Sequence, residues 1–260
     1  MLTELIAAVK TVAREEIMPR YLKVAYSRKA DGSILTEADI ASQAALSSRL
    51  RQLMDAPVLA EEMPEERQRE LWQAGTGDLW CLDPIDGTSN FVKGLPYFAV
   101  SVALLHDRRP VLGLVYNPVC DDVFYAKAGR GAYYNGERLD ASVGSEKLAH
   151  SVAGVDFKRL DPALSTRLAA HPPYSSQRNY GSSALDWCLL ATRRIDLYVH
   201  GGQKIWDYMA GALILAEAGG VACTLEHDDF WADDPFSRPV VAAGTPAMLS
   251  QWRDWLRQKA

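Results

Sequence analysis

Asp83-Pro84-Ile85-Asp86-Gly87-Thr88-Ser89-Asn90 follows a short apolar run, residues 79–82, that is typical of a buried strand. Two carboxylates therefore come at the end of a predicted strand, and the small residues after them have backbone N–H groups that can face an anion. Carboxylates bind hard divalent cations, and free N–H groups at the start of a helix bind phosphate. The stretch therefore predicts a place where a metal ion meets a phosphate, and an ordinary Asp-Gly turn after a strand is the alternative.

The composition of the 260-residue chain is that of a globular protein, with 48% hydrophobic and 23% charged residues. The formal net charge of −5 gives no basic surface for nucleic acid or an anionic membrane, so we expect neither as a partner. The scattered cysteines form no CxxC pair, which argues against zinc and disulfide frameworks. Because the sequence has no signal-peptide pattern and no apolar run of about 18 residues, we expect a cytoplasmic protein.

The order of predicted elements favours an α/β protein. Apolar residues at three- and four-residue spacing predict a first helix within residues 2–17, and Thr36 begins a second helix. Further strands, helices and a hairpin are predicted over residues 57–60, 98–105, 111–116, 132–139, 151–155, 184–192, 195–199, 206–218, 221–225, 240–243 and 248–257. With no repeat or linker, we expect one domain over 1–260 with an α+β lobe (1–148) and an α/β lobe (149–260).

Three further acidic residues are candidates for the same site, and each has a structural alternative. Glu61 follows a predicted strand, as Asp83 does, but it can also belong to a solvated, highly charged surface. Asp39 fits a capping box that Thr36 opens. Asp207 stands at the start of an apolar helix, where a carboxylate serves equally as a cap or as a partner of the helix dipole. Taken singly, Asp39 and Asp207 fit structural roles better than catalytic ones.

All of these positions match one protein family in their order and local context. The chain resembles the inositol monophosphatase family, whose members are magnesium-dependent sugar phosphatases related to fructose-1,6-bisphosphatase. The resemblance covers nearly the whole chain, and its most specific stretches are residues 35–39, 60–62, 83–91, 206–211 and 217–220. The family fold is a layered αβαβα sandwich, which we therefore expect here.

The resemblance implies roles for individual residues. The expected Mg²⁺ ligands are Glu61, Asp83, Asp86, Asp207 and the carbonyl oxygen of Ile85. The expected phosphate-binding residues are Gly87, Thr88 and Ser89, and the expected substrate-binding residues are Asp86, Gly181, Ser183 and His200. The expected catalytic pair is Thr88 and Asp39, which would orient and help deprotonate a metal-bound water.

These roles imply hydrolysis of a small phosphate monoester by in-line attack of water, without a covalent intermediate. A small polyol or sugar phosphate, similar to inositol 1-phosphate, ranks first as substrate, and 3′-phosphoadenosine 5′-phosphate and histidinol phosphate are the alternatives. In inositol-specific members a glutamate binds substrate hydroxyls at the position of His200, and an imidazole lacks the two acceptor oxygens of a carboxylate. This difference weakens the case for inositol phosphate itself.

The resemblance also implies a homodimer, and it leaves a function of another class open. Some bacterial relatives act as protein-binding regulators of transcription complexes, but every expected metal ligand is present in this chain. Arg28 and Lys29 lie in a segment that corresponds to a mobile loop of the family. We expect a solvated charge pair there, and closure over the metal site is the alternative.

Overall fold

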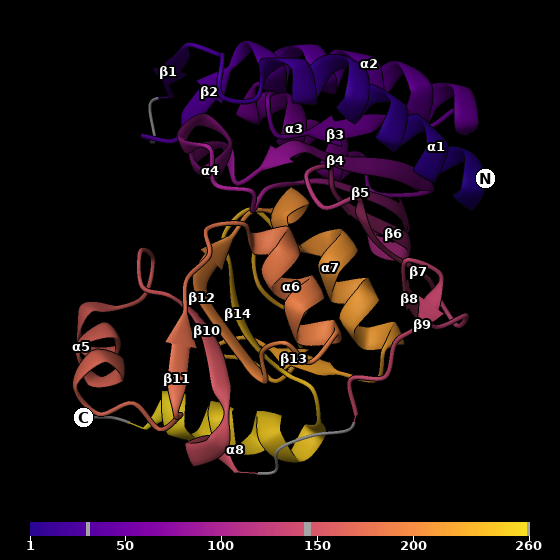
Figure 1. The fold of residues 1–260 in the computed structure, drawn as a ribbon. Helices are drawn as coiled ribbons and strands as arrows, with labels where there is room; N and C mark the ends of the chain where they lie inside the picture. Colours follow the sequence, from indigo (N-terminus) through magenta and orange to yellow (C-terminus); the bar gives the residue numbers. More distant parts are fainter. Residues whose placement is uncertain (30–31, 143–146, 259–260) are drawn as a thin grey trace.

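The computed structural model describes residues 1–29, 32–142 and 147–258 (Figure 1). Its α-helices are α1 (Leu2–Val12), α2 (Glu37–Leu53), α3 (Glu65–Ala74), α4 (Thr88–Lys93), α5 (Pro162–Ala170), α6 (Ser183–Ala191), α7 (Ile205–Glu217) and α8 (Pro246–Arg257). Shorter helical turns are Ala13–Ile17, Met18–Arg20 and Leu148–His150. Within the described residues, no helix has the length and apolar character that a membrane span requires.

The strands form two large sheets and a small one. They are β1 (Tyr26–Arg28), β2 (Ile34–Thr36), β3 (Val58–Ala60), β4 (Asp78–Asp86), β5 (Ala99–His106), β6 (Arg109–Asn117), β7 (Asp122–Lys127), β8 (Ala132–Tyr134), β9 (Glu137–Arg138), β10 (Val152–Asp156), β11 (Ser176–Arg178), β12 (Leu197–Gln203), β13 (Val221–Cys223) and β14 (Arg238–Ala243). β3 to β9 form a seven-stranded sheet in chain order, in which β3 runs parallel to β4 and the other neighbours are antiparallel. The five-stranded sheet has the order β11-β10-β12-β14-β13, with β11, β10 and β12 parallel.

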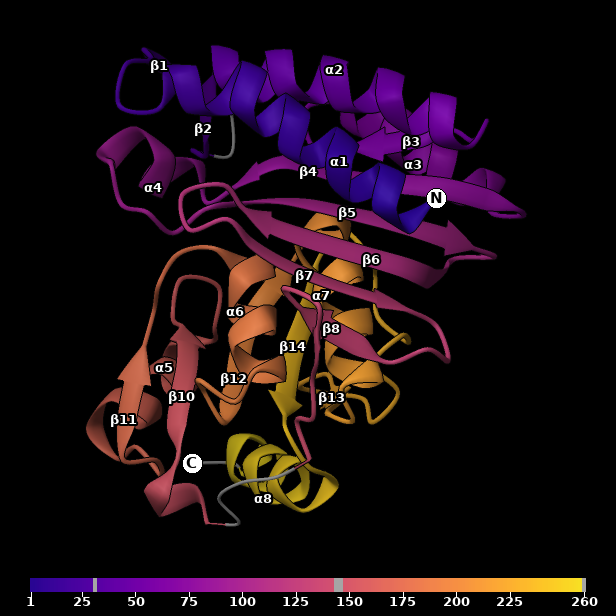
Figure 2. The same ribbon diagram turned by 45° about the vertical axis from the view of Figure 1, so that its right-hand side comes forward.

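Figures 1 and 2 show five layers in which helices and sheets alternate. α1 and α2 cover the outer face of the seven-stranded sheet, and α6 and α7 lie between the two large sheets. α5 and α8 pack on the far face of the five-stranded sheet. The fold is therefore the layered αβαβα sandwich expected from the sequence. Because α6 and α7 pack on both sheets, the division into two lobes stays a prediction.

The layered packing explains the sequences of the two elements that carry the acidic residues. α7 is buried on all sides, from Ile205 to Leu215, so it is apolar all round instead of amphipathic. β4 is buried from Leu79 to Asp86 because α2 packs on one of its faces and α7 on the other. Carboxylates at the end of β4 are therefore largely removed from water.

Most predicted elements are present near their expected bounds, including the helix capped by Thr36 and the hairpin at Asn135-Gly136. From the sequence we did not predict α3, α5, β1, β2, β7 or β11. α3 and β11 carry few apolar residues, so hydrophobic periodicity does not mark them. The start of α5 had a signal that we did not use, because Asp161 precedes Pro162 as an N-cap precedes a first-turn proline.

Gly211 lies where α7 approaches α6, and a Cβ atom added there would be 2.4 Å from the Cβ atom of Trp187. We expect Gly211→Ala to lower the melting temperature, because overpacking costs about 1–3 kcal/mol and the gain in helix propensity is about 1 kcal/mol at most. Thermal unfolding followed by circular dichroism measures the change. Ala216→Gly, at an exposed position of the same helix, is the control that changes propensity alone. A higher melting temperature for Gly211→Ala would contradict the close packing of these helices.

Candidate metal and phosphate site

Three aspartates from two elements meet in the interior of the fold. Asp83 and Asp86 lie at the end of β4, and Asp207 lies in the first turn of α7. One carboxylate oxygen from each residue lies within 4.8 Å of the other two. Asp83 and Asp86 are buried and Asp207 is half-buried, and such a group of hard oxygen ligands fits a divalent cation, because carboxylates removed from water need a compensating charge.

The electrostatics of the three carboxyl groups agree with this interpretation. Burial raises the pKa of Asp83 well above its usual value, and the charges of Glu61, Asp86 and Asp207 raise it further. Burial and Asp86 likewise raise the pKa of Asp207, and burial raises that of Asp86. The group therefore opposes the ionisation of its own members unless a cation stabilises the charged forms.

Hydrogen bonds fix the orientation of each aspartate. Asp83 Oδ1 accepts the backbone N–H of Ile85 at 2.9 Å, and Asp207 Oδ2 accepts that of Lys204 at 2.9 Å. Each carboxylate keeps one oxygen outside these bonds. That second oxygen is the atom that can bind a ligand.

Asp86 connects β4 to the start of α6. Its Oδ2 atom accepts the hydroxyl of Ser182 at 2.5 Å and the backbone N–H of Ala184 at 2.7 Å. Asn90 makes a second connection, because its Nδ2 group donates to the carbonyl oxygens of Tyr97 and Tyr180, both at 2.7 Å. The middle helical layer thus holds the end of β4 in place.

Glu61 lies at the cleft but outside the group of three aspartates. It follows β3, and its Oε1 atom forms an ion pair with Lys29 Nζ at 2.9 Å, while Lys29 also contacts Glu62 at 2.6 Å. Burial opposes the charge on Lys29, but the two carboxylates together raise its pKa above the usual value. Lys29 is therefore not the solvated residue that we expected, whereas Arg28 is exposed, as expected. The alternative of closure over the site stays a prediction.

The predicted phosphate-binding turn has the backbone that the sequence requires. Gly87 has a φ of +91°, a left-handed conformation that favours glycine, and α4 begins at Thr88. A Cβ atom at Gly87 would lie 3.1 Å from the carbonyl oxygens of both Gly181 and Tyr97. The amides of Thr88 and Ser89 are the first of the helix, so they have no intrahelical acceptor.

Asp39 caps α2 and also lies beside Thr88. Its Oδ2 atom accepts the Thr36 backbone N–H at 2.7 Å and completes a capping box. Its Oδ1 atom lies 3.5 Å from Thr88 Oγ1, whose hydroxyl lies 3.1 Å from the Ile85 carbonyl oxygen. Burial raises the pKa of Asp39 to about 6, which suits a group that accepts a proton near neutral pH.

A cleft of about 270 Å³ is lined by most of the expected site residues, among them Glu61, Asp86 and Asp207, whereas Asp39, Asp83 and Ile85 are not in its lining. Gly181, Ser183 and His200 line it, and His200 lies inside β12, not at the end of a strand. Burial lowers the pKa of the His200 imidazole to about 4, so the ring is neutral. The residues in the cleft that our sequence analysis missed are Asp156, Lys158, Arg159 and Asp186. The position of Asp156 after the predicted strand 151–155 was a usable signal.

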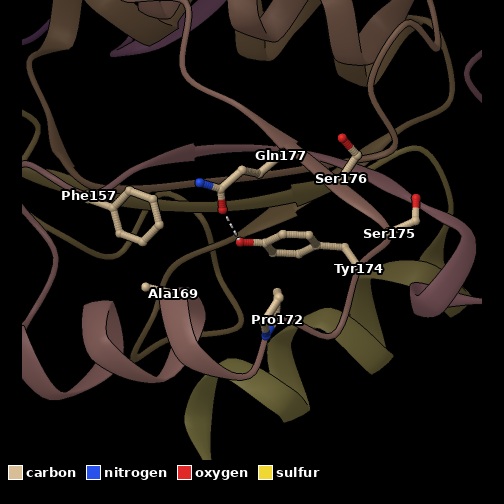
Figure 3. A pocket seen from close by; sticks show the side chains of 7 residues that line it. All are labelled: Phe157, Ala169, Pro172, Tyr174, Ser175, Ser176 and Gln177. Atoms are coloured by element: carbon tan, nitrogen blue, oxygen red, sulfur yellow. Dashed lines mark hydrogen bonds between the residues drawn. The ribbon is translucent and has the colours of Figure 1, made fainter.

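A separate cavity of about 400 Å³ lies between α5 and β11 (Figure 3). Phe157, Tyr174 and Gln177 line it, and the Tyr174 hydroxyl donates to Gln177 Oε1 at 2.6 Å. Its lining holds no carboxylate and none of the expected site residues. Most of the expected site residues thus line the cleft at β4, and none of them lines this cavity.

Comparisons with known proteins identify the family of this chain. A sequence model of the inositol monophosphatase family matches residues 1–256. A Nus factor SuhB from Pasteurella multocida is 37% identical over 204 residues, 75% of this chain and 73% of that protein. Inositol monophosphatase 2 from Solanum lycopersicum is 33% identical over 205 residues, 76% of this chain and 77% of that protein. The IMPase of Thermotoga maritima has a similar structure, with a TM-score of 0.83 and 26% identity, covering 97% of this chain and 94% of that chain. The chain belongs to the inositol monophosphatase family.

Proposed function

We propose that this protein is a Mg²⁺-dependent hydrolase of small phosphate monoesters, with polyol or sugar phosphates as substrates. The observation that carries the proposal is the meeting of Asp83, Asp86 and Asp207 beside the glycine turn that begins α4. A buried anionic group next to free amides fits a substrate phosphate only when cations bridge the two.

The proposed division of labour follows from the positions of the side chains. Asp83, Asp86, Asp207, Glu61 and the Ile85 carbonyl would hold Mg²⁺, which acts as a Lewis acid and stabilises the leaving alkoxide when bound. The amides that follow Gly87 would orient the phosphate. Thr88 would hold the attacking water in line, and Asp39, with its pKa raised to about 6, would accept a proton.

The lining of the cleft and the relatives of the chain both support a polyol or sugar phosphate as the substrate. Ser183, Asp156 and Asp186 offer hydroxyl and carboxylate groups in the lining of the cleft, which suit the hydroxyls of a polyol or sugar. Relatives include inositol-1-monophosphatase of Bacillus subtilis, 34% identical over 189 residues, and fructose-1,6-bisphosphatase/inositol-1-monophosphatase of Aquifex aeolicus, 34% identical over 199 residues. 3′-Phosphoadenosine 5′-phosphate and histidinol phosphate remain the alternative substrates. A cytoplasmic homodimer also remains a prediction.

A second candidate function is that of a protein-binding regulator, because the relative from Pasteurella multocida is named a Nus factor. A pull-down with Asp83→Asn separates the two candidates. Retention of a partner by the variant, together with loss of hydrolysis, would show that one chain has both functions.

We expect hydrolysis to require Mg²⁺ and Asp83→Asn to abolish nearly all of it, because the substitution removes a ligand charge at the centre of the site. Phosphate release from a panel of monoesters, with Mg²⁺ or with EDTA, measures this. Asp161→Asn is the matched control, because it neutralises an exposed carboxylate that caps α5. Substantial turnover in EDTA, or full activity of Asp83→Asn, would refute the metal assignment.

Thr88→Ala and Asp39→Asn should each lower kcat by on the order of 10²-fold with little change in KM, because they remove the proton acceptor or its link to water. Since the two residues act as one unit, the double variant should be far less impaired than the product of the single effects. Thr245→Ala, which removes the cap of α8, controls for capping loss. If Asp39→Asn lowers only the melting temperature, Asp39 is a helix cap and nothing more.

The metal-free protein should lose stability as pH rises. Burial raises the pKa of Asp86 from 3.8 to about 6 and raises that of Asp83 well above its usual value. Since the unfolded state releases these protons at lower pH, their contribution to stability is lost as pH rises through the folded-state values. Asp83→Asn in EDTA should therefore become increasingly more stable than the wild type between about pH 4 and pH 7, as calorimetry measures. A difference in melting temperature that does not depend on pH would contradict this electrostatic account.

A further inference from the structure

His200 occupies the position at which inositol-specific relatives are expected to carry a hydroxyl-binding glutamate, but its ring lacks the two acceptor oxygens of a carboxylate. The backbone N–H of Gly202 donates to His200 Nδ1 at 3.0 Å, so Nδ1 carries no hydrogen. In the neutral ring the proton is then on Nε2. The imidazole therefore offers one N–H donor, at Nε2, where that glutamate would offer two acceptor oxygens.

The atom nearest to this donor among the acidic groups of the cleft belongs to Asp156. β10 runs parallel to β12, and Asp156 stands opposite His200 in their register. Asp156 Oδ2 lies 3.6 Å from His200 Nε2, and Oδ1 accepts the backbone N–H of Lys158 at 2.8 Å. The side chain of Asp156 is 22% exposed and lines the cleft, whereas that of His200 is 5% exposed. β10 thus places the carboxylate of Asp156 beside His200, the position on β12 at which we expected a glutamate.

The backbone around Asp156 is held firmly. Arg159 Nη1 donates to the Gly202 carbonyl oxygen at 2.9 Å, which ties the end of β10 to the end of β12. A Cβ atom at Gly201 would lie 1.9 Å from the Arg159 carbonyl oxygen, so only glycine permits this close approach. Phe157 lines the other cavity (Figure 3), so residues 156 and 157 contribute to different cavities. The carboxylate of Asp156 is therefore fixed at the cleft.

We propose that Asp156 is the specificity-determining residue that accepts hydrogen bonds from the hydroxyl groups of the substrate, with His200 Nε2–H facing it from the neighbouring strand. The inference rests on the proposed phosphatase function and deepens it. It names the preferred substrates as phosphate monoesters whose alcohol carries at least one further hydroxyl group. Asp186 fits this role less well, because it is more deeply buried than Asp156.

Two esters with the same carbon skeleton test the proposal. Glycerol 2-phosphate carries two free hydroxyl groups, and isopropyl phosphate carries none. With Mg²⁺ present, kcat/KM is measured for both esters with the wild type and with Asp156→Ala. The ratio of the two values should fall by about tenfold or more in the variant, as expected for loss of a charge-assisted hydrogen bond. Hydrolysis of isopropyl phosphate should stay within about twofold of the wild type, since that ester makes no such bond.

Two further variants complete the experiment. Asp156→Asn keeps the hydrogen bond to Lys158 N–H and should give a smaller fall in the ratio, so the test does not depend on the folding of Asp156→Ala. Asp161→Asn neutralises a carboxylate outside the cleft and should leave the ratio unchanged.

The outcomes separate this inference from the function on which it rests. An unchanged ratio, or an equal fall for both esters, would overturn the role of Asp156 and leave the phosphatase intact. A wild-type protein that hydrolyses neither ester would overturn the proposed function and this inference together.

Discussion

The repulsion among three clustered carboxylates is the constraint on which the site depends. One carboxylate oxygen each of Asp83, Asp86 and Asp207 lies within 4.8 Å of the other two, and burial together with the charge of Asp86 raises the pKa of both Asp83 and Asp207. A fold that only needed stability would gain by replacing such a group with apolar residues. Under the proposed function, a bound cation would turn this repulsion into binding free energy.

The sandwich architecture creates this constraint. β4 and α7 are buried because helices lie on both faces of the seven-stranded sheet, and their ends converge at the junction with the middle helical layer. Ser182 and the start of α6 hold Asp86 from the other side. The cleft at this junction is also lined by Asp156 of β10 and His200 of β12, so that residues of both large sheets line it. One cleft thus receives contributions from segments far apart in the chain.

Local features could be predicted from the sequence, whereas long-range pairings could not. The strand that ends in Asp83 and Asp86, the positive-φ glycine at Gly87 and the capping box at Asp39 each depend on neighbouring residues, so their patterns are visible in the chain. The order of elements and the family resemblance together were sufficient for the layered fold. The elements without strong apolar periodicity, α3 and β11, were missed.

The contacts that were not foreseen join residues distant in sequence. Lys29 pairs with Glu61 and Glu62, which lie more than thirty residues further along the chain. The residues next to Lys29 in the sequence do not predict this pairing. Asp156 lies beside His200 because of the register between β10 and β12, and that register could not be predicted from the sequence. In the sequence, His200 stands where the family resemblance leads us to expect a glutamate, and in the fold Asp156 of β10 places a carboxylate beside it.

Direct observation of the metal tests the central claim most plainly. Crystals soaked in Mn²⁺, a divalent cation that accepts the same oxygen ligands and scatters anomalously, would locate the ion without reference to activity. We expect an anomalous peak between the carboxylates of Asp83, Asp86 and Asp207, at about 2.0–2.3 Å from their free oxygens as for hard divalent cations. A peak elsewhere, or none at these aspartates at saturating Mn²⁺, would contradict the account.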